Sequence, residues 1–107
     1  MTATEFAVDV QRDGDVAVLM LSGDVSGGAE ERLLGAYAQV GEAGVVLLDF
    51  SAVDYINSTG IALIVGVLAE ARKAGREVQA RGLAEHYREI FRITRLSDFM
   101  TILDDER

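Results

Sequence analysis

Two adjacent hydroxyl side chains stand at a point where the chain could carry chemistry. Ser58 and Thr59 lie in a short polar hinge, Asn57-Ser58-Thr59-Gly60, between two apolar runs. The run before the hinge is rich in β-branched residues and suits a buried strand, whereas the run over residues 61–71 suits a helix. The first turn of a helix has unpaired N–H groups and the positive end of the macrodipole. A hydroxyl in the hinge therefore stands where negative charge is favoured.

The same serine could in principle be a nucleophile. Ser58, His86 and one of the aspartates would formally make a Ser-His-Asp triad, but Ser58 is not in a Gly-x-Ser-x-Gly elbow, and nothing indicates an oxyanion loop. His86 is the only histidine and lies between Glu85 and Tyr87, where an exposed position on a helix is expected. A small hydrolase is therefore the weakest hypothesis, and we expect a protein without catalysis of its own.

Two aspartates near the end of the central apolar run could be taken for paired acid and base groups. We interpret Asp49 instead as a strand-end residue bonded to nearby backbone N–H groups, and Asp54 as a turn former.

Composition narrows the class of protein. The chain has 107 residues, half of them apolar and a quarter charged, which predicts a single compact domain over residues 1–107. The formal net charge of −8 disfavours a nucleic-acid partner. With no cysteine and one histidine, we expect no metal site and no cofactor. The first residues lack the features of a signal peptide and no apolar run reaches membrane-spanning length, so we expect a cytoplasmic protein without membrane insertion.

Apolar periodicity and turn residues predict the order β-β-α-β-α-β-α-β. The expected fold class is α/β, with a single mixed β-sheet of four to five strands and three to four helices packed against it. The second strand, 16–21, is apolar enough to be covered on both sides, and the third is expected over 45–49. We expect Ser26 or a neighbour to cap the first helix, with Glu30 and Glu31 near the positive end of its dipole.

The helix after the hinge has two apolar sides. Its core face is predicted to hold four residues, Ile61, Ile64, Val65 and Leu68. Leu63 and Val67 fall on another side. They are either part of a wide buried stripe or a small exposed patch for a partner.

Residues 47–63, which include the hinge, resemble the signature of the STAS domain in its bacterial anti-sigma factor antagonist form. That family shows an apolar strand ending in Asp-Leu-Ser, a short loop, and Asp-Ser-Ser/Thr-Gly-Leu opening a helix. Weaker matches at 21–25, 75–78 and 90–96 extend the resemblance over nearly the whole chain.

The resemblance implies a phosphorylation switch. In such proteins the first hydroxyl residue of the hinge, Ser58 here, is phosphorylated by a serine kinase that is also the anti-sigma factor, and Thr59 is the fallback acceptor. The unmodified antagonist binds the kinase and frees the sigma factor, and the phosphorylated antagonist releases the kinase. A serine phosphatase stays open as a second partner, and the oligomeric state is not predicted. The expected partner-binding residues are Asp24, Ser26, Asn57, Ser58, Thr59, Gly60, Leu63 and Val67.

Two positions depart from the family pattern. The family usually has an aspartate before the target serine, where this chain has Asn57, and another after the second-strand glycine, where it has Ser26. Either Asn57 keeps the cap hydrogen bond without repelling a phosphate, or a kinase-facing carboxylate has been lost. The alternative function is a STAS scaffold subunit of a stressosome-like or membrane-lipid transport complex without a phospho-switch, to which an exposed Leu63–Val67 patch would be suited.

Overall fold

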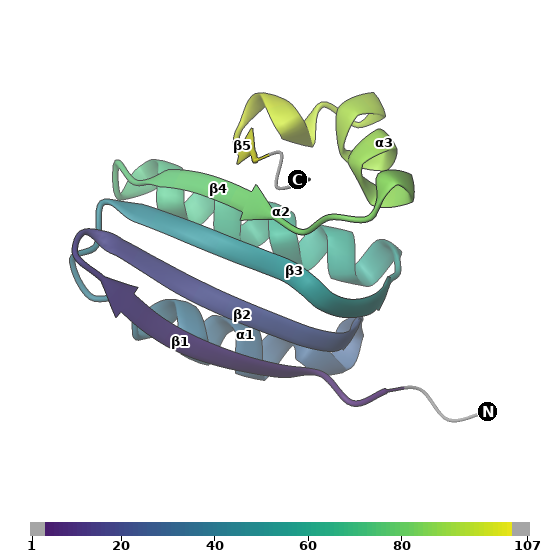
Figure 1. The fold of residues 1–107 in the computed structure, drawn as a ribbon, viewed down its shortest axis with the longest axis horizontal. Helices are drawn as coiled ribbons and strands as arrows, with labels where there is room; N and C mark the ends of the chain where they lie inside the picture. The colour runs from purple at the N-terminus through teal and green to yellow at the C-terminus, as the bar shows by residue number, and fades with distance from the viewer. Residues whose placement is uncertain (1–3, 104–107) are drawn as a thin grey trace.

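The structure is a computed structural model that describes residues 4–103 (Figure 1). Its elements follow the predicted order, with two short 3₁₀ helices, η1 and η2, added. They are β1 (Ala7–Asp13), β2 (Val16–Val25), η1 (Gly27–Ala29), α1 (Glu30–Ala38), β3 (Val45–Ile56), α2 (Ser58–Lys73), β4 (Glu77–Arg81), α3 (Glu85–Ile93), η2 (Leu96–Asp98) and β5 (Thr101–Ile102).

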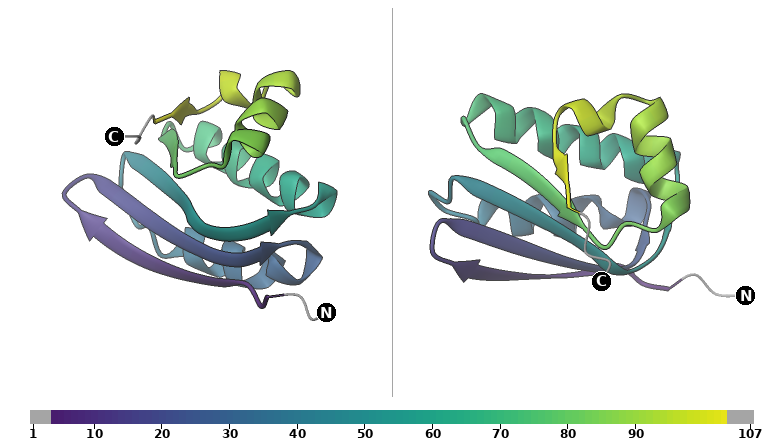
Figure 2. Two further views of the ribbon diagram at one scale, coloured as in Figure 1. Left: turned by 45° about the vertical axis from the view of Figure 1, so that its right-hand side comes forward. Right: turned by 45° about the horizontal axis from the view of Figure 1, so that its top comes forward.

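The five strands form one mixed sheet, which confirms the predicted fold class. Their spatial order is β1-β2-β3-β4-β5, with β1 antiparallel to β2 and every later pair parallel. Each parallel crossover therefore steps in the same direction across the sheet, and crossovers are nearly always right-handed. As a consequence α1 and α2 lie on the same face, as Figures 1 and 2 show, while α3, η2 and β5 form a unit beyond β4.

The core lies between the sheet and these two helices. Its buried side chains include Ala17, Leu19, Leu21 and Val25 of β2, Val46, Leu48 and Phe50 of β3, Leu33 and Ala36 of α1, and Ile64, Val67, Leu68 and Ala71 of α2. The unit beyond β4 is anchored by Phe91 of α3, whose ring packs edge-on against Phe50 with centroids 6.2 Å apart. The prediction that β2 is covered on both sides is wrong: its residues alternate between half-buried and buried, because both crossover helices lie on one face.

β3 is longer than predicted. The sequence indicated a strand ending at Asp49, but the strand continues to Ile56. β4 pairs with it only as far as Asp49, and beyond that point β3 pairs with β2 as its one strand neighbour, with two register shifts. Asp54 therefore lies within a strand, and its interpretation as a turn former is wrong.

The start of α1 also differs from the prediction. Ser26 precedes η1 and its side chain makes no capping hydrogen bond. The two glycines that follow allow a 3₁₀ turn, closed by the Ala29 N–H donating to the Ser26 carbonyl at 2.9 Å, so that α1 begins four residues after Ser26. Glu30 and Glu31 occupy the first turn, as predicted.

Across residues 4–103, none of the helices combines the length and the apolar character that crossing a bilayer requires.

Candidate functional site

The hinge joins β3 to α2 beside the end of β2. The Asn57 N–H donates to the Val25 carbonyl at 3.2 Å, which continues the strand pairing into the hinge. Gly60 lies against the same carbonyl, and a Cβ atom at this position would stand 1.9 Å from the Val25 oxygen. Only glycine fits such a close approach of two backbones. The first turn of α2 is therefore held directly against β2.

Asn57 caps α2. Its side-chain Oδ1 accepts a hydrogen bond from the Gly60 N–H at 2.8 Å, and its backbone carbonyl accepts from the Ile61 N–H at 2.9 Å. An asparagine cap satisfies one of the N–H groups that a helix start leaves unpaired. The cap hydrogen bond expected of Asn57 is therefore present.

Ser58 and Thr59 are both exposed and are the first two residues of α2. No acidic residue lies in this first turn, so the positive end of the helix dipole meets no carboxylate from its own turn. Thr59 packs toward Gly27, where an added Cβ would stand 3.6 Å from the threonine methyl group. The Ser58 hydroxyl is thus open to solvent at a helix start that favours negative charge.

A tyrosine from a distant element supports the hinge. The Tyr87 hydroxyl of α3 accepts a hydrogen bond from the Ile56 N–H at 2.9 Å, immediately before the cap residue. The sequence shows Tyr87 and Phe91 at helical spacing, which predicts only that they share a buried face. Nothing in the sequence pairs that hydroxyl with the end of β3.

Tyr55 is a second residue that the sequence reasoning missed. Its side chain is 53% exposed, two residues before the cap and opposite Asp24 in the sheet register. The alternation of Tyr55 with buried Ile56 was the available sign, because it places the tyrosine on the outward side of the strand.

Asp24 and Ser26 flank Val25 and so lie next to the hinge through the backbone. Both are half-buried and line a hollow of about 360 Å³ together with Glu31 and Arg32 of α1. The structure thus brings the end of β2 and the start of α2 together.

Of the two alternatives for Leu63 and Val67, the structure shows the wide buried stripe and not the exposed patch. Val67 is only 1% exposed and belongs to the core, and Leu63 is half-buried against it. Conversely Val65, which was assigned to the core face, is 43% exposed. The contact between Gly60 and the Val25 carbonyl fixes how the helix is rotated, and this rotation turns Val67 inward and Val65 outward.

Asp49 accepts a hydrogen bond from a backbone N–H, as expected, but it lies within β3 and not at a strand end, and it also pairs with a side chain that was not predicted. Its Oδ1 accepts from the Ser51 N–H at 2.9 Å, and its Oδ2 lies 3.0 Å from Nη2 of Arg81. Burial by itself raises the pKa of this carboxyl, but the hydrogen bonds from Ser51 and the Arg81 cation outweigh burial, so the pKa lies below its usual value. Asp49 is a permanently ionised structural group at neutral pH.

The residues of the hydrolase hypothesis are not assembled into a triad. His86 is exposed and stacks edge-on near the Tyr87 ring, with centroids 5.0 Å apart. No hydrogen bond joins Ser58 to His86 in residues 4–103. Within the same residues, no group of three or more His, Cys, Asp or Glu side chains could hold a metal ion.

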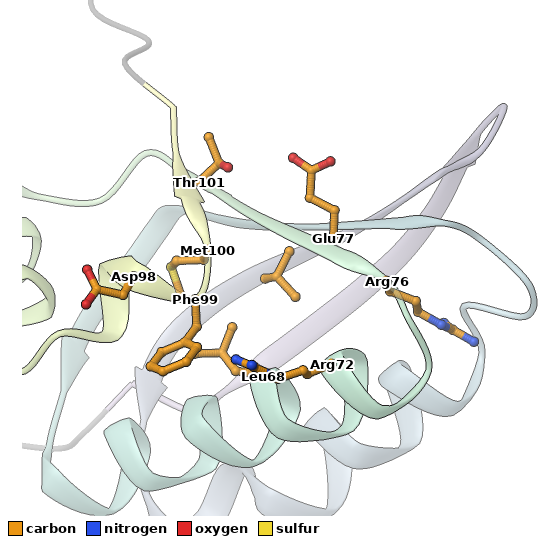
Figure 3. Close-up of a pocket in the computed structure, with 9 residues that line it drawn as sticks. Leu68, Arg72, Arg76, Glu77, Asp98, Phe99, Met100 and Thr101 are labelled. Carbon is orange, nitrogen blue, oxygen red and sulfur yellow. The ribbon is translucent and has the colours of Figure 1, made fainter.

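A separate hollow of about 310 Å³ lies between the last turns of α2 and the η2–β5 segment (Figure 3). The ring of Phe99 lies against Leu68, with the Arg72 guanidinium 5.4 Å from the ring centroid. Arg72 is 14 residues along α2 from Ser58, a separation of about 21 Å along the helix axis. None of the predicted site residues lines this hollow.

Comparison with known proteins agrees with the fold. The family model described as "Mlab, STAS domain" matches residues 8–104, so the chain belongs to the STAS domain family.

Among its relatives, the anti-sigma-B factor antagonist of Listeria monocytogenes is 30% identical over 98 residues, which cover 90% of this chain and 86% of that protein. The corresponding protein of Listeria innocua is equally similar.

Solved structures of the same fold include the anti-sigma factor antagonist SpoIIAA in its unphosphorylated form, with a TM-score of 0.74 at 15% identity over 94% of this chain and 90% of that one. The phosphorylated form of the Bacillus protein matches with a TM-score of 0.72 at 16% identity over 92% and 93% of the two chains.

Proposed function

We propose that this chain is an anti-sigma factor antagonist that is switched by phosphorylation of Ser58. The unmodified hinge surface binds an anti-sigma serine kinase and thereby frees a sigma factor, and the phosphorylated chain releases the kinase. The observation that carries this proposal is the exposed Ser58 hydroxyl at the first position of α2, in a turn without a carboxylate. The name of the Listeria relative supports the antagonist role.

The chemical step belongs to the kinase. The Ser58 Oγ attacks the γ-phosphorus of ATP, a new P–O bond forms, the bond to the leaving ADP breaks, and the hydroxyl proton passes to a base of the kinase. The product carries about −1.5 to −2 additional charges at neutral pH. The antagonist contributes an accessible hydroxyl on a rigid helix start and no catalytic group of its own.

The helix start explains why the fold tolerates that charge. A phosphate at the first turn of α2 meets N–H groups and the positive end of the dipole. Asn57 holds the Gly60 N–H and brings no negative charge of its own. These contacts favour the interpretation that the replacement of the usual aspartate by Asn57 is compatible with phosphorylation.

The same charge opposes docking. A kinase that covers Ser58 also lies near the exposed Tyr55 and the acidic side chain of Asp24. Aromatic residues such as Tyr55 are typical of well-packed interface centres. A phosphate buried there would lose its hydration and be repelled by nearby carboxylates. Dephosphorylation by a serine phosphatase would restore the docking surface.

Incubation with candidate anti-sigma kinases and ATP, followed by mass spectrometry, tests the acceptor. We expect one phosphate, located on Ser58, that is lost in Ser58→Ala and kept in Thr59→Ala. Stable binding to a partner complex with no mass gain from any kinase would contradict the switch. That result would favour the alternative of a permanent scaffold or transport-complex subunit.

Binding measurements separate charge from shape. Ser58→Asp is expected to weaken kinase binding at least about tenfold, whereas Ser58→Asn, an uncharged side chain of the same shape, is expected to weaken it less. Equal losses in the two variants would show that shape at Ser58, rather than charge, controls docking.

A further inference from the structure

Within residues 4–103, no helix covers the second face of the sheet. Figure 1 looks onto this face, with α1 and α2 behind the strands. Sheets built from parallel strands are usually covered on both faces. Three of the four strand pairings here are parallel, yet the described residues place both long helices on one side.

An apolar stripe runs along the uncovered face. Side chains alternate along a strand, so the residues between the core positions of β2 and β3 point away from the helices. The sheet register sets Val16 beside Val45, and Val18 beside Leu47. We call the five apolar side chains Val16, Val18, Met20, Val45 and Leu47 the β2–β3 stripe. Leu47 is only 6% exposed, but it is not part of the core cluster between the sheet and the helices.

Carboxylates border the stripe on both sides. Asp9 and Asp13 of β1 are exposed and lie beside Met20 and Val16, and Glu77 of β4 is exposed beside Val45. None of these three forms a salt bridge within residues 4–103.

The arginine of this face is already neutralised. Arg81 is paired with Asp49 at 3.0 Å, so it offers little attraction to an incoming acidic group. The uncovered face is therefore an apolar strip between negative margins, on a chain whose net charge is −8.

We propose that this face binds an amphipathic helix of a partner protein, whose apolar side covers the β2–β3 stripe and whose flanks carry lysine or arginine. The occupant follows from charge complementarity. A second copy of this chain would bring the same carboxylates against each other, and an anionic membrane would be repelled by them. The stripe is about 13 Å long, which about nine helical residues would span.

This inference goes beyond the antagonist function. The stripe lies on the face opposite α2, so a helix bound there leaves the Ser58 hydroxyl uncovered. The same chain could therefore keep one partner bound at the β2–β3 stripe while the kinase binds to and leaves the hinge.

Two designed peptides test the proposal with the full chain. Each is an amphipathic helix of about 14 residues with the same leucine and alanine face, flanked by lysine in one peptide and by glutamate in the other. Fluorescence anisotropy at low ionic strength is expected to show at least about tenfold tighter binding of the lysine peptide. Failure of the lysine peptide to bind, or equal binding of both peptides, would overturn the proposal.

Variants locate the binding face. Val18→Lys is expected to weaken binding of the lysine peptide at least about tenfold. The matched control is Val65→Lys, on an exposed residue of α2, which is expected to leave binding unchanged. The double variant Asp9→Lys with Asp13→Lys changes only exposed side chains, so it keeps the test decisive if Val18→Lys does not fold. Equal loss in the Val65 control, or none in the double variant, would overturn the assignment.

Two further measurements distinguish the other occupants. Sedimentation that shows a dimer lost in Val18→Lys would mean that a second copy covers the stripe, which overturns the proposal. Binding to vesicles of anionic phospholipid that is lost in the same variant would likewise overturn it. Monomeric behaviour without vesicle binding is the expected result.

Discussion

α1 and α2 begin in opposite ways, although both follow a strand of the same sheet and lie on the same face. α1 follows Ala29, which offers no side-chain cap, and has Glu30 and Glu31 in its first turn. α2 is capped by Asn57 and has no acidic residue in its first turn, where it carries two hydroxyls instead. The positive end of α1 thus has permanent compensating charge. The positive end of α2 has no such charge in its own turn, and this is where the proposed phosphate would be added and removed.

The largest expected effect comes from breaking the contact that holds the start of α2 against β2. Gly60→Ala would place a Cβ 1.9 Å from the Val25 oxygen, so β2 and α2 must separate. We expect a loss of about 3 kcal/mol in the free energy of unfolding. Urea denaturation measures it.

Gly66→Ala is the matched control in the same helix. An added Cβ there meets no atom within 4 Å, and alanine is the better helix former, so a gain of about 0.5–1 kcal/mol is expected. A similar loss in both variants would show that helix geometry in general, rather than the Val25 contact, sets the effect.

The next effect concerns the distant support of the hinge. Tyr87→Phe leaves the Ile56 N–H without its partner and is expected to reduce stability by about 1–2 kcal/mol. Hydrogen exchange should become faster in the first turn of α2 and stay unchanged in α1. Tyr37→Phe is the control, because the buried Tyr37 hydroxyl has no hydrogen-bond partner in residues 4–103. It is expected to cause no loss.

Removing the side chain before each helix should destabilise the protein more at α2 than at α1. Asn57→Ala removes the bond to the Gly60 N–H and is expected to cost about 1 kcal/mol. Ser26 precedes η1, which leads into α1, and its side chain makes no capping bond. Ser26→Ala should therefore change stability by less than about 0.5 kcal/mol. Thermal unfolding of both variants checks this, and equal losses would contradict the contrast between the helix starts.

The smallest expected effect tests the dipole directly. Ser58→Asp should stabilise the fold by about 0.3–1 kcal/mol at low salt, and the gain should shrink as salt screens the charge. Glu31→Gln in α1 should lose a similar amount. A destabilised Ser58→Asp protein would mean that the start of α2 does not accept negative charge.

Local chemistry made part of this structure predictable. The cap at Asn57 and the acidic first turn of α1 follow from residue types within a few positions, and strand order follows from apolar periodicity. The rotation of α2 was not predictable, because Val65 and Val67 are placed by the contact between Gly60 and β2. These contacts join residues far apart in the chain.

The length of β3 and the role of Tyr87 escaped prediction for the same reason. Residues 50–56 do not alternate cleanly, and they form a strand because the end of β2 is there to pair with them. The bond between Tyr87 and Ile56 spans 31 positions. The position of the Ser58 hydroxyl in the hinge was predictable. The contacts that support the hinge, from Val25 to Gly60 and from Tyr87 to Ile56, were not.

The strand order has one more consequence. In doubly wound sheets the order of strands reverses, and small-molecule crevices open where the reversal occurs. The described strands follow one another across the sheet without such a reversal, so their ends form a continuous rim. The proposed kinase would therefore reach Ser58 at an exposed helix start beside the ends of β2 and β3, by pressing a complementary surface onto it.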